Sequence, residues 1–195
     1  MTEPTRHIVN LQALPEKFPT HKHDPAFWES LGRAVATFGF LEEILAKAIF
    51  AFTATTPYSE EEAQKAFEKW LPQLQRALSD QLWNLIESYD QAVRENPDAS
   101  IENLDDLIRD LKKAAKIRNV ICHGSWRSPD AEGKSIPFFV NRQHERFDTA
   151  IDVAWLAQLQ KHVSELICAV INTVTHMGWQ FPGSAGPGKV ITLPY

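Results

Sequence analysis

The sequence predicts an all-α protein: a bundle of four or five helices with a small β-hairpin inserted before the last helix. Apolar residues recur at intervals of three and four along several stretches, which is the period of one helix face. Residues that cap helices precede those stretches, and glycine or proline follows them. Only residues 125–147 combine turn residues (Pro129, Gly133 and Pro137) with a short apolar run, IPFFV, as a hairpin would.

The first long helix is expected to cover residues 24 to about 53. Asp24 followed by Pro25 is a strong start, because an aspartate caps the helix and proline fits its first position. The apolar stripe that follows consists of Leu31, Val35, Phe38, Leu45, Ile49 and Phe52. Glu42 falls on the same stripe, where an apolar residue is expected.

A second helical pattern runs from residue 59 to about residue 94. Ser59 and Glu62 have the spacing of a capping box, and Pro72 is expected to kink the helix or to begin a new one. The apolar face continues through Leu74, Leu78, Leu82, Leu85, Ile86 and Tyr89. The residues Asn96-Pro97-Asp98 then form a turn.

Two further helices complete the bundle. Ser100 is expected to open a helix with an apolar stripe of Leu104, Leu107, Ile108, Leu111, Ala115 and Ile121. Arg118 lies on the same core-facing side. Gly124 is expected to end this helix in the left-handed conformation, which glycine adopts at little cost. Thr149 with Asp152 begins a last helix that runs to Gly178.

These elements divide the chain into three parts. Residues 1–23 are expected to form an extended N-terminal arm, residues 24–178 the helical domain, and residues 179–195 a Pro/Gly-rich C-terminal tail. Within the domain, residues 125–147 form the connection that holds the short β element. His21 and His23 in the arm are a weak metal site, because no carboxylates or thiols cluster beside them. We therefore expect neither a metal nor a cofactor.

Composition narrows the classes of function. A net charge of −5 argues against a protein that coats nucleic acid generally, and only residues 109–127 are locally basic. From charge alone, a solvated helix face explains this basic stretch as well as a functional surface does. No apolar run is long enough to cross a bilayer, and the start of the chain has no signal-peptide pattern. Cys122 and Cys168 are expected to be reduced, and the compartment to be the cytoplasm.

The two charged residues on apolar stripes, Glu42 and Arg118, are expected to contact each other, since an unpaired ion in a core is unfavourable. Asn119 and His123 share one helix face, whereas Arg118 and His123 lie roughly 140° apart around the axis and ~7.5 Å along it. Arg118 and His123 can converge only if the helix loosens at its end or if a second subunit contributes its own copies. Arginine, histidine and asparagine together suit attack on a phosphodiester without a metal.

The run Arg118-Asn119-Val120-Ile121-Cys122-His123, followed by Gly124 and Trp126, resembles the R-N-x-x-x-H motif of the HEPN superfamily (higher eukaryotes and prokaryotes nucleotide-binding domains). Phe38-Gly39-Phe40-Leu41-Glu42 is similar to the F-G-x-x-E motif of a bacterial branch. The resemblance implies a homodimeric helical bundle whose two motifs meet across the interface. It also implies metal-independent cleavage of single-stranded RNA, leaving 2′,3′-cyclic phosphate and 5′-hydroxyl ends.

Carried over to this chain, the resemblance assigns roles to four residues. Arg118 stabilises the scissile phosphate, His123 transfers a proton, Asn119 supports it, and Glu42 orients Arg118. Lys112, Lys116 and Arg127 in the basic stretch are expected to bind RNA, with modest and salt-sensitive affinity. The resemblance also suggests a toxin or anti-phage effector that an antitoxin or regulatory protein holds in check.

Two other interpretations remain open. The first is a non-catalytic HEPN-like dimer that serves as an interaction module or binds nucleotide or RNA. Arg118 and Glu42 would then be a structural pair, and His123 a cation at a helix C-terminus. The second is an all-α ligand-binding protein that uses its tryptophans, although the helical spacing of Trp28, Trp70 and Trp83 favours a place in the core.

Overall fold

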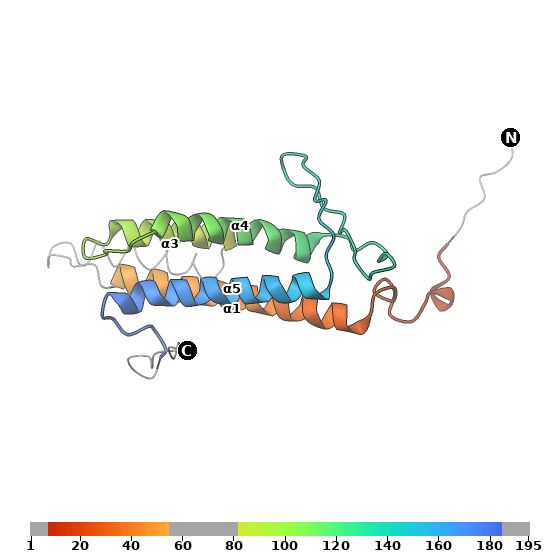
Figure 1. Cartoon of the computed structure of the whole chain (residues 1–195), viewed down its shortest axis with the longest axis horizontal. Helices are drawn as coiled ribbons and strands as arrows, with labels where there is room; N and C mark the ends of the chain where they lie inside the picture. Colours follow the sequence, from red (N-terminus) through yellow and green to blue (C-terminus); the bar gives the residue numbers. More distant parts are fainter. Residues whose placement is uncertain (1–7, 55–81, 185–195) are drawn as a thin grey trace.

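The computed structural model describes residues 8–54 and 82–184, and it has an all-α fold. Within these residues lie four α-helices: α1 (Pro25–Ala54), α3 (Leu82–Glu95), α4 (Leu104–His123) and α5 (Val153–His176). They run alongside one another as an elongated bundle, as Figure 1 shows. The first half of the predicted 59–94 helix, with its capping box and Pro72, lies outside the described residues. A short 3₁₀ turn, η1 (Leu11–Ala13), precedes the bundle.

Local sequence signals set the start of α1 as predicted, whereas α5 begins later than Thr149, at Val153, with Asp152 as its N-cap. The backbone N–H of Ala26 donates to Asp24 Oδ1 over 2.8 Å, and α1 begins at Pro25. At the start of α5, Trp155 N–H donates to Asp152 Oδ1 over 2.7 Å. Each aspartate satisfies an N–H group that has no partner inside its own helix.

The start of α4 differs from the prediction. The helix begins at Leu104 rather than Ser100, after Asn103 in the left-handed region at φ 60°. The Asn96 carboxamide explains the delay, because it accepts from Asp98 N–H over 3.0 Å and donates to the Phe52 carbonyl over 2.8 Å. These contacts hold the turn that starts at Asn96 against the end of α1, so α4 begins after Asn103 rather than at Ser100.

The conformation predicted for Gly124 is wrong. Gly124 closes α4 with extended angles, φ −69° and ψ 139°, and its N–H donates to the Val120 carbonyl over 2.8 Å. Glycine is required here for space rather than for a left-handed turn. A Cβ atom at this position would lie 2.6 Å from the Val120 oxygen and 2.8 Å from Pro137 Cβ.

The predicted β-hairpin is also wrong in detail, since residues 125–147 contain no strand. Three isolated antiparallel bridges take its place: Ser125 with Phe138, Ser135 with Ile151, and Val140 with Arg146. The turns at residues 130–134 and 141–145 fold the segment back on itself twice. The connection is therefore a folded loop, held to both α4 and the approach to α5.

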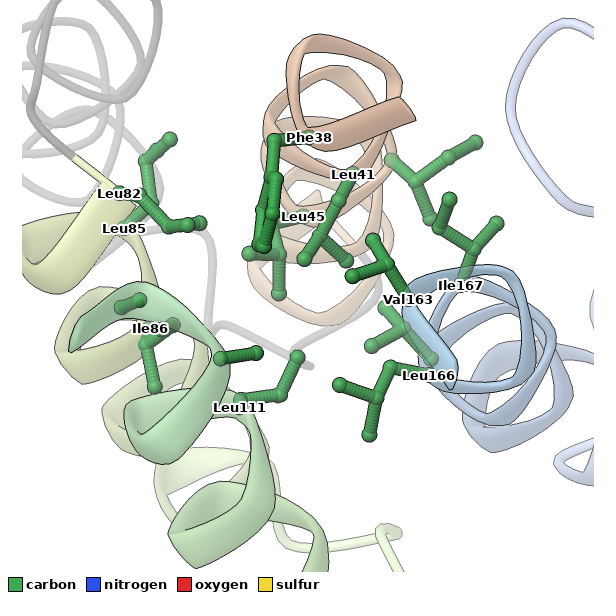
Figure 2. Close-up of a cluster of buried hydrophobic side chains, with 14 of the residues drawn as sticks. Phe38, Leu41, Leu45, Leu82, Leu85, Ile86, Leu111, Val163, Leu166 and Ile167 are labelled. Carbon is green, nitrogen blue, oxygen red and sulfur yellow. The ribbon is translucent and has the colours of Figure 1, made fainter. Parts of the chain in front are cut away.

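The core lies where the four helices meet. In Figure 2, apolar side chains from all four helices point into one shared interior: Phe38, Leu41 and Leu45 of α1, Leu82, Leu85 and Ile86 of α3, Leu111 of α4, and Val163, Leu166 and Ile167 of α5. One polar pair is buried with them. The Tyr89 hydroxyl lies 2.8 Å from Thr173 Oγ1, which itself donates to the Val170 carbonyl.

The arm and the connection meet at one end of the bundle, beside the start of α1 (Figure 1). Trp28 Nε1 donates to the Thr20 carbonyl over 2.8 Å, and Lys22 Nζ donates to Ser128 Oγ over 2.9 Å. The predicted extended arm is therefore exposed over residues 8–12 but attached to the bundle by residues 20–23. In the described part of the tail, residues 179–184 are not helical, and Phe181 is buried.

Candidate functional site

The predicted contact between Glu42 and Arg118 is present. Arg118 Nη2 lies 3.4 Å from Glu42 Oε1, and this ion pair connects α4 to α1. The side chains are 27 % and 28 % exposed, so the pair lies at the edge of the core rather than inside it. Partial exposure lets solvent offset the desolvation of both charges while their geometry stays defined.

Helix α4 does not loosen before His123. Its last hydrogen bond, from Gly124 N–H to the Val120 carbonyl, has ordinary helical spacing. Arg118 and His123 therefore keep the separation of a regular helix, roughly 140° around the axis and ~7.5 Å along it. Among the described residues, no hydrogen bond or ion pair joins them. The first of the two predicted routes to convergence is thus excluded within this conformation of the chain.

The exposed side of α4 carries a second group of motif residues. Lys112, Lys116, Asn119 and His123 follow one another at intervals of four, three and four, which places them within about 60° of arc on a regular helix. Lys116, Asn119 and His123 are exposed, and Lys112 is half-buried. We call these four residues the α4 stripe. It places two cations and an amide in line with the histidine, on a different side of the helix from Arg118.

The three residues predicted to bind RNA differ in their surroundings. Lys112 Nζ lies 3.6 Å from Glu87 Oε1 and 5.3 Å from the centre of the Trp83 ring, so its charge already has partners on α3. Lys116 has no carboxylate partner within the described part of the chain. Arg127 lies over the Phe138 ring at 5.0 Å, in the connection. Lys116 and Arg127 are therefore the two that remain available to an anion.

Cys122 is a neighbour of Arg118 that the sequence analysis did not include in the site. It stands four residues beyond Arg118, one helical turn further along α4. Burial raises the pKa of the Cys122 thiol, the Arg118 charge opposes that shift, and the Glu42 charge adds to it. A raised pKa keeps the thiol protonated near neutral pH, which argues against a nucleophilic role. Its spacing from Arg118 is the signal that could have revealed it.

His23, half of the weak metal candidate, packs in an aromatic cluster. Its ring stacks on Phe27 at 4.4 Å and meets Trp28 and Trp126 edge-on at 5.2 and 6.3 Å. Across residues 8–54 and 82–184, no three His, Cys, Asp or Glu side chains gather closely enough to hold a metal ion. Both cysteines in that range are free thiols.

The tryptophans considered for ligand binding mostly serve packing. Trp28 and Trp126 belong to the aromatic cluster around Phe27 and are half-buried. Trp83 lies on α3, where its indole N–H donates to Glu87 over 2.9 Å. Trp70 lies outside the described residues. Trp28 therefore packs against the core as its spacing predicts, whereas the core position predicted for Trp83 is wrong, because this residue is 36 % exposed.

No described helix is both long and apolar enough to span a membrane. Comparison of the chain with protein-family models, with curated proteins and with solved structures finds no match.

Proposed function

We propose that this protein is a metal-independent endoribonuclease of the HEPN type, which acts as a homodimer on single-stranded RNA in the cytoplasm. The observation that carries the proposal is the 3.4 Å pair between Arg118 and Glu42. This pair holds a permanently charged guanidinium at the edge of the bundle, near the end of the helix that also presents His123 to solvent. Both functional groups of the motif are thus accessible and supported by a regular helix.

The proposed reaction is attack of a ribose 2′-hydroxyl on the adjacent phosphorus. The bond from O2′ to phosphorus forms as the bond from phosphorus to O5′ breaks. One product therefore ends in a 2′,3′-cyclic phosphate and the other in a 5′-hydroxyl. The His123 imidazole takes the 2′ proton or supplies one to the leaving O5′. The Arg118 guanidinium stabilises the negative charge on the phosphate oxygens, and Asn119 orients the reacting groups.

A second copy of the chain supplies what one copy lacks. In one chain, Arg118 and His123 lie on different sides of α4, so one phosphate cannot contact both groups in this geometry. If two copies face each other across their α4 helices, Arg118 of one chain can lie beside His123 of the other. The proposed reaction therefore requires a homodimer.

Lys116, Asn119 and His123 of the α4 stripe provide the RNA contacts in this proposal together with Arg127, whereas Lys112 is already paired with Glu87. Because the whole chain carries a charge of −5, RNA affinity rests on few cations and falls steeply with salt. A nuclease of this kind would act as a toxin or anti-phage effector, and an antitoxin or regulatory protein would limit its activity.

The test is cleavage of labelled single-stranded RNA in EDTA by wild type, His123→Ala and His162→Ala. His162 is a matched control, because it is an exposed histidine on α5, away from the motif. We expect cleavage by wild type and His162→Ala, with 2′,3′-cyclic phosphate ends, and loss of cleavage in His123→Ala. Sedimentation should show dimers of all three proteins. Equal cleavage by wild type and His123→Ala would refute the proposal.

One observation favours a second candidate, the non-catalytic dimeric interaction module or nucleotide- or RNA-binding module. Glu42 already balances the Arg118 charge within one chain, as a structural ion pair would. On this alternative, RNA is not cut, and His123→Ala changes neither the oligomeric state nor the binding of a partner. The same assay therefore separates the two candidates.

A further inference from the structure

The connection between α4 and α5 carries an aromatic ring, Phe138, with two arginines close to it. The guanidinium carbon of Arg127 lies 5.0 Å from the centre of the Phe138 ring, and that of Arg146 lies 5.4 Å from it. Phe138 is nevertheless 45 % exposed. The three side chains line a hollow of about 320 Å³ together with Ile136, Phe139 and Phe147. We call this hollow the Phe138 pocket.

The arginines of the connection differ from the other described arginines in their partners. Arg33, Arg94, Arg109 and Arg118 each pair with at least one carboxylate. Within residues 8–54 and 82–184, Arg127, Arg142 and Arg146 have no carboxylate within ion-pair distance. Two of these three lie on the Phe138 ring. The pocket therefore combines uncompensated positive charge with an exposed aromatic surface.

We propose that the Phe138 pocket binds an unpaired base of single-stranded RNA together with its flanking phosphates. The base would add to the stack of ring and guanidinium, since unpaired RNA bases stack on aromatic and arginine planes. Arg127 and Arg146 would contact the phosphates, which a guanidinium can bind with two hydrogen bonds. An acidic surface of a partner protein could also pair with the two arginines, but it would not account for the exposed aromatic ring beside them.

The pocket lies next to the motif in the folded chain. Ser125, two residues after His123, forms a bridge with Phe138 through hydrogen bonds of 3.0 and 2.8 Å. Two residues span at most about 7 Å, and a hydrogen-bonded antiparallel pair has Cα atoms about 5.5 Å apart. RNA in the pocket would therefore lie close to the end of α4. The choice of RNA as ligand rests on the proposed ribonuclease function, and the pocket would hold the strand beside its site.

The test measures RNA binding separately from cleavage. Each full-length protein carries His123→Ala so that the probe stays intact, and fluorescence anisotropy follows a labelled unstructured RNA oligonucleotide. We expect Phe138→Ala to weaken binding about tenfold, as loss of one stacked base does. Phe40→Ala is the matched control, because Phe40 is 48 % exposed on α1 and lies two residues from Glu42, hence on the opposite helix face. We expect it to bind like its parent.

Two further variants keep the test decisive if Phe138→Ala is unstable. Phe138→Leu keeps apolar bulk without a ring and should weaken binding, whereas Phe138→Tyr should retain it.

The arginines are tested by the salt dependence of binding. Arg127→Gln and Arg146→Gln should each reduce that dependence, and Arg33→Gln, which removes an already paired charge, should not. Normal binding by both Phe138→Ala and Phe138→Leu would overturn the proposal. Equal affinity for a duplex of the same sequence would also overturn it.

The outcomes distinguish this inference from the proposed function. If wild type cleaves RNA in EDTA but Phe138 variants bind normally, the pocket proposal fails and the nuclease proposal stands. If wild type does not cleave RNA but the Phe138 variants lose binding, the pocket proposal stands and the nuclease proposal fails.

Discussion

Arg118 Nη2 lies 3.4 Å from Glu42 Oε1, joining two helices through residues that are 76 positions apart in the chain. Both charges stand where the apolar pattern of their helices calls for a core residue. The pair therefore has a structural effect, fixing α4 against α1, and in the proposed enzyme a positioning effect on the guanidinium. These two effects can be measured separately.

We expect Glu42→Gln to lower the free energy of unfolding by about 1 kcal/mol, because it leaves the Arg118 charge without its carboxylate at a half-buried position. Glu43→Gln is the matched control, since Glu43 pairs with Lys47 on the exposed side of the same helix. That change should stay within about 0.5 kcal/mol of wild type. Urea denaturation gives both values. Equal losses of unfolding free energy in the two variants would show that the Glu42–Arg118 pair stabilises the fold no more than an exposed ion pair does.

The same variants test positioning. In the proposed enzyme, Glu42→Gln should reduce the rate of RNA cleavage beyond what its unfolded fraction explains, because Arg118 is no longer held in place. Glu43→Gln should cleave at the wild-type rate. Unchanged cleavage by a folded Glu42→Gln protein would limit Glu42 to a structural role.

Gly124→Ala should destabilise the protein by about 1–3 kcal/mol, the usual range for overpacking. The new Cβ would lie 2.6 Å from the Val120 oxygen and 2.8 Å from Pro137 Cβ, so either the helix end or the connection must move. Gly32→Ala provides the contrast, because within residues 8–54 and 82–184 no atom beyond the adjoining backbone of α1 lies within 4 Å of its Cβ position. An alanine there should stabilise the helix by about 0.5–1 kcal/mol. If Gly124→Ala were as stable as Gly32→Ala, the close approach of Pro137 would be absent in solution.

Tyr89→Phe should change the stability of the protein in opposite directions at neutral and high pH. At pH 7 the variant loses the hydrogen bond to Thr173, at about 1 kcal/mol. Burial raises the pKa of Tyr89 to about 12 from an ordinary value of 10.0. The unfolded chain therefore releases this proton first, and wild-type stability falls between about pH 10 and pH 12, by about 3 kcal/mol in all.

The phenylalanine variant lacks this alkaline loss, so the stability difference should shrink and then reverse as the pH rises above about 10. Denaturation of both proteins at pH 7, 10 and 11 measures it. A constant difference across that range would mean that Tyr89 is not buried as described.

Wild type should lose stability at acid pH because His23 is buried, and His23→Phe should not show this part of the loss. Burial lowers the pKa of His23 from 6.5, and within the described residues Nε2 has no hydrogen-bond partner. Lys22 and Asp24 flank His23 in the chain, and the Asp24 carboxylate caps α1. The unfolded chain therefore binds a proton at His23 more readily than the folded chain does. The folded protein has its full stability above about pH 6.5 and loses part of it as the pH falls toward the lower pKa of the folded state.

Thermal unfolding at pH 7.5 and pH 5 should therefore show a smaller acid-induced drop in Tm for His23→Phe than for wild type. Phenylalanine keeps the apolar contact with Phe27 and cannot be protonated. An equal drop in both proteins would assign the acid sensitivity to other groups.

Where short-range signals decide the structure, the sequence sufficed to predict it. Asp24-Pro25 and Asp152 begin helices because each side chain reaches an N–H group two or three residues away. The partnership of Glu42 with Arg118 followed from periodicity alone, because two opposite charges on apolar stripes have few other ways to be stabilised. These inferences need only the geometry of a regular helix and the high free energy of an unpaired buried charge.

Tertiary structure decided the features that depend on contacts between distant segments. Gly124 is extended because Pro137 packs against it, and Asn96 delays α4 because its side chain binds the end of α1. Residues 125–147 form isolated bridges rather than a hairpin, and this path brings Arg127 and Arg146 onto one ring. Helical period relates residues a few positions apart, whereas these contacts depend on where two separate backbones meet. Only the packed chain determines that distance.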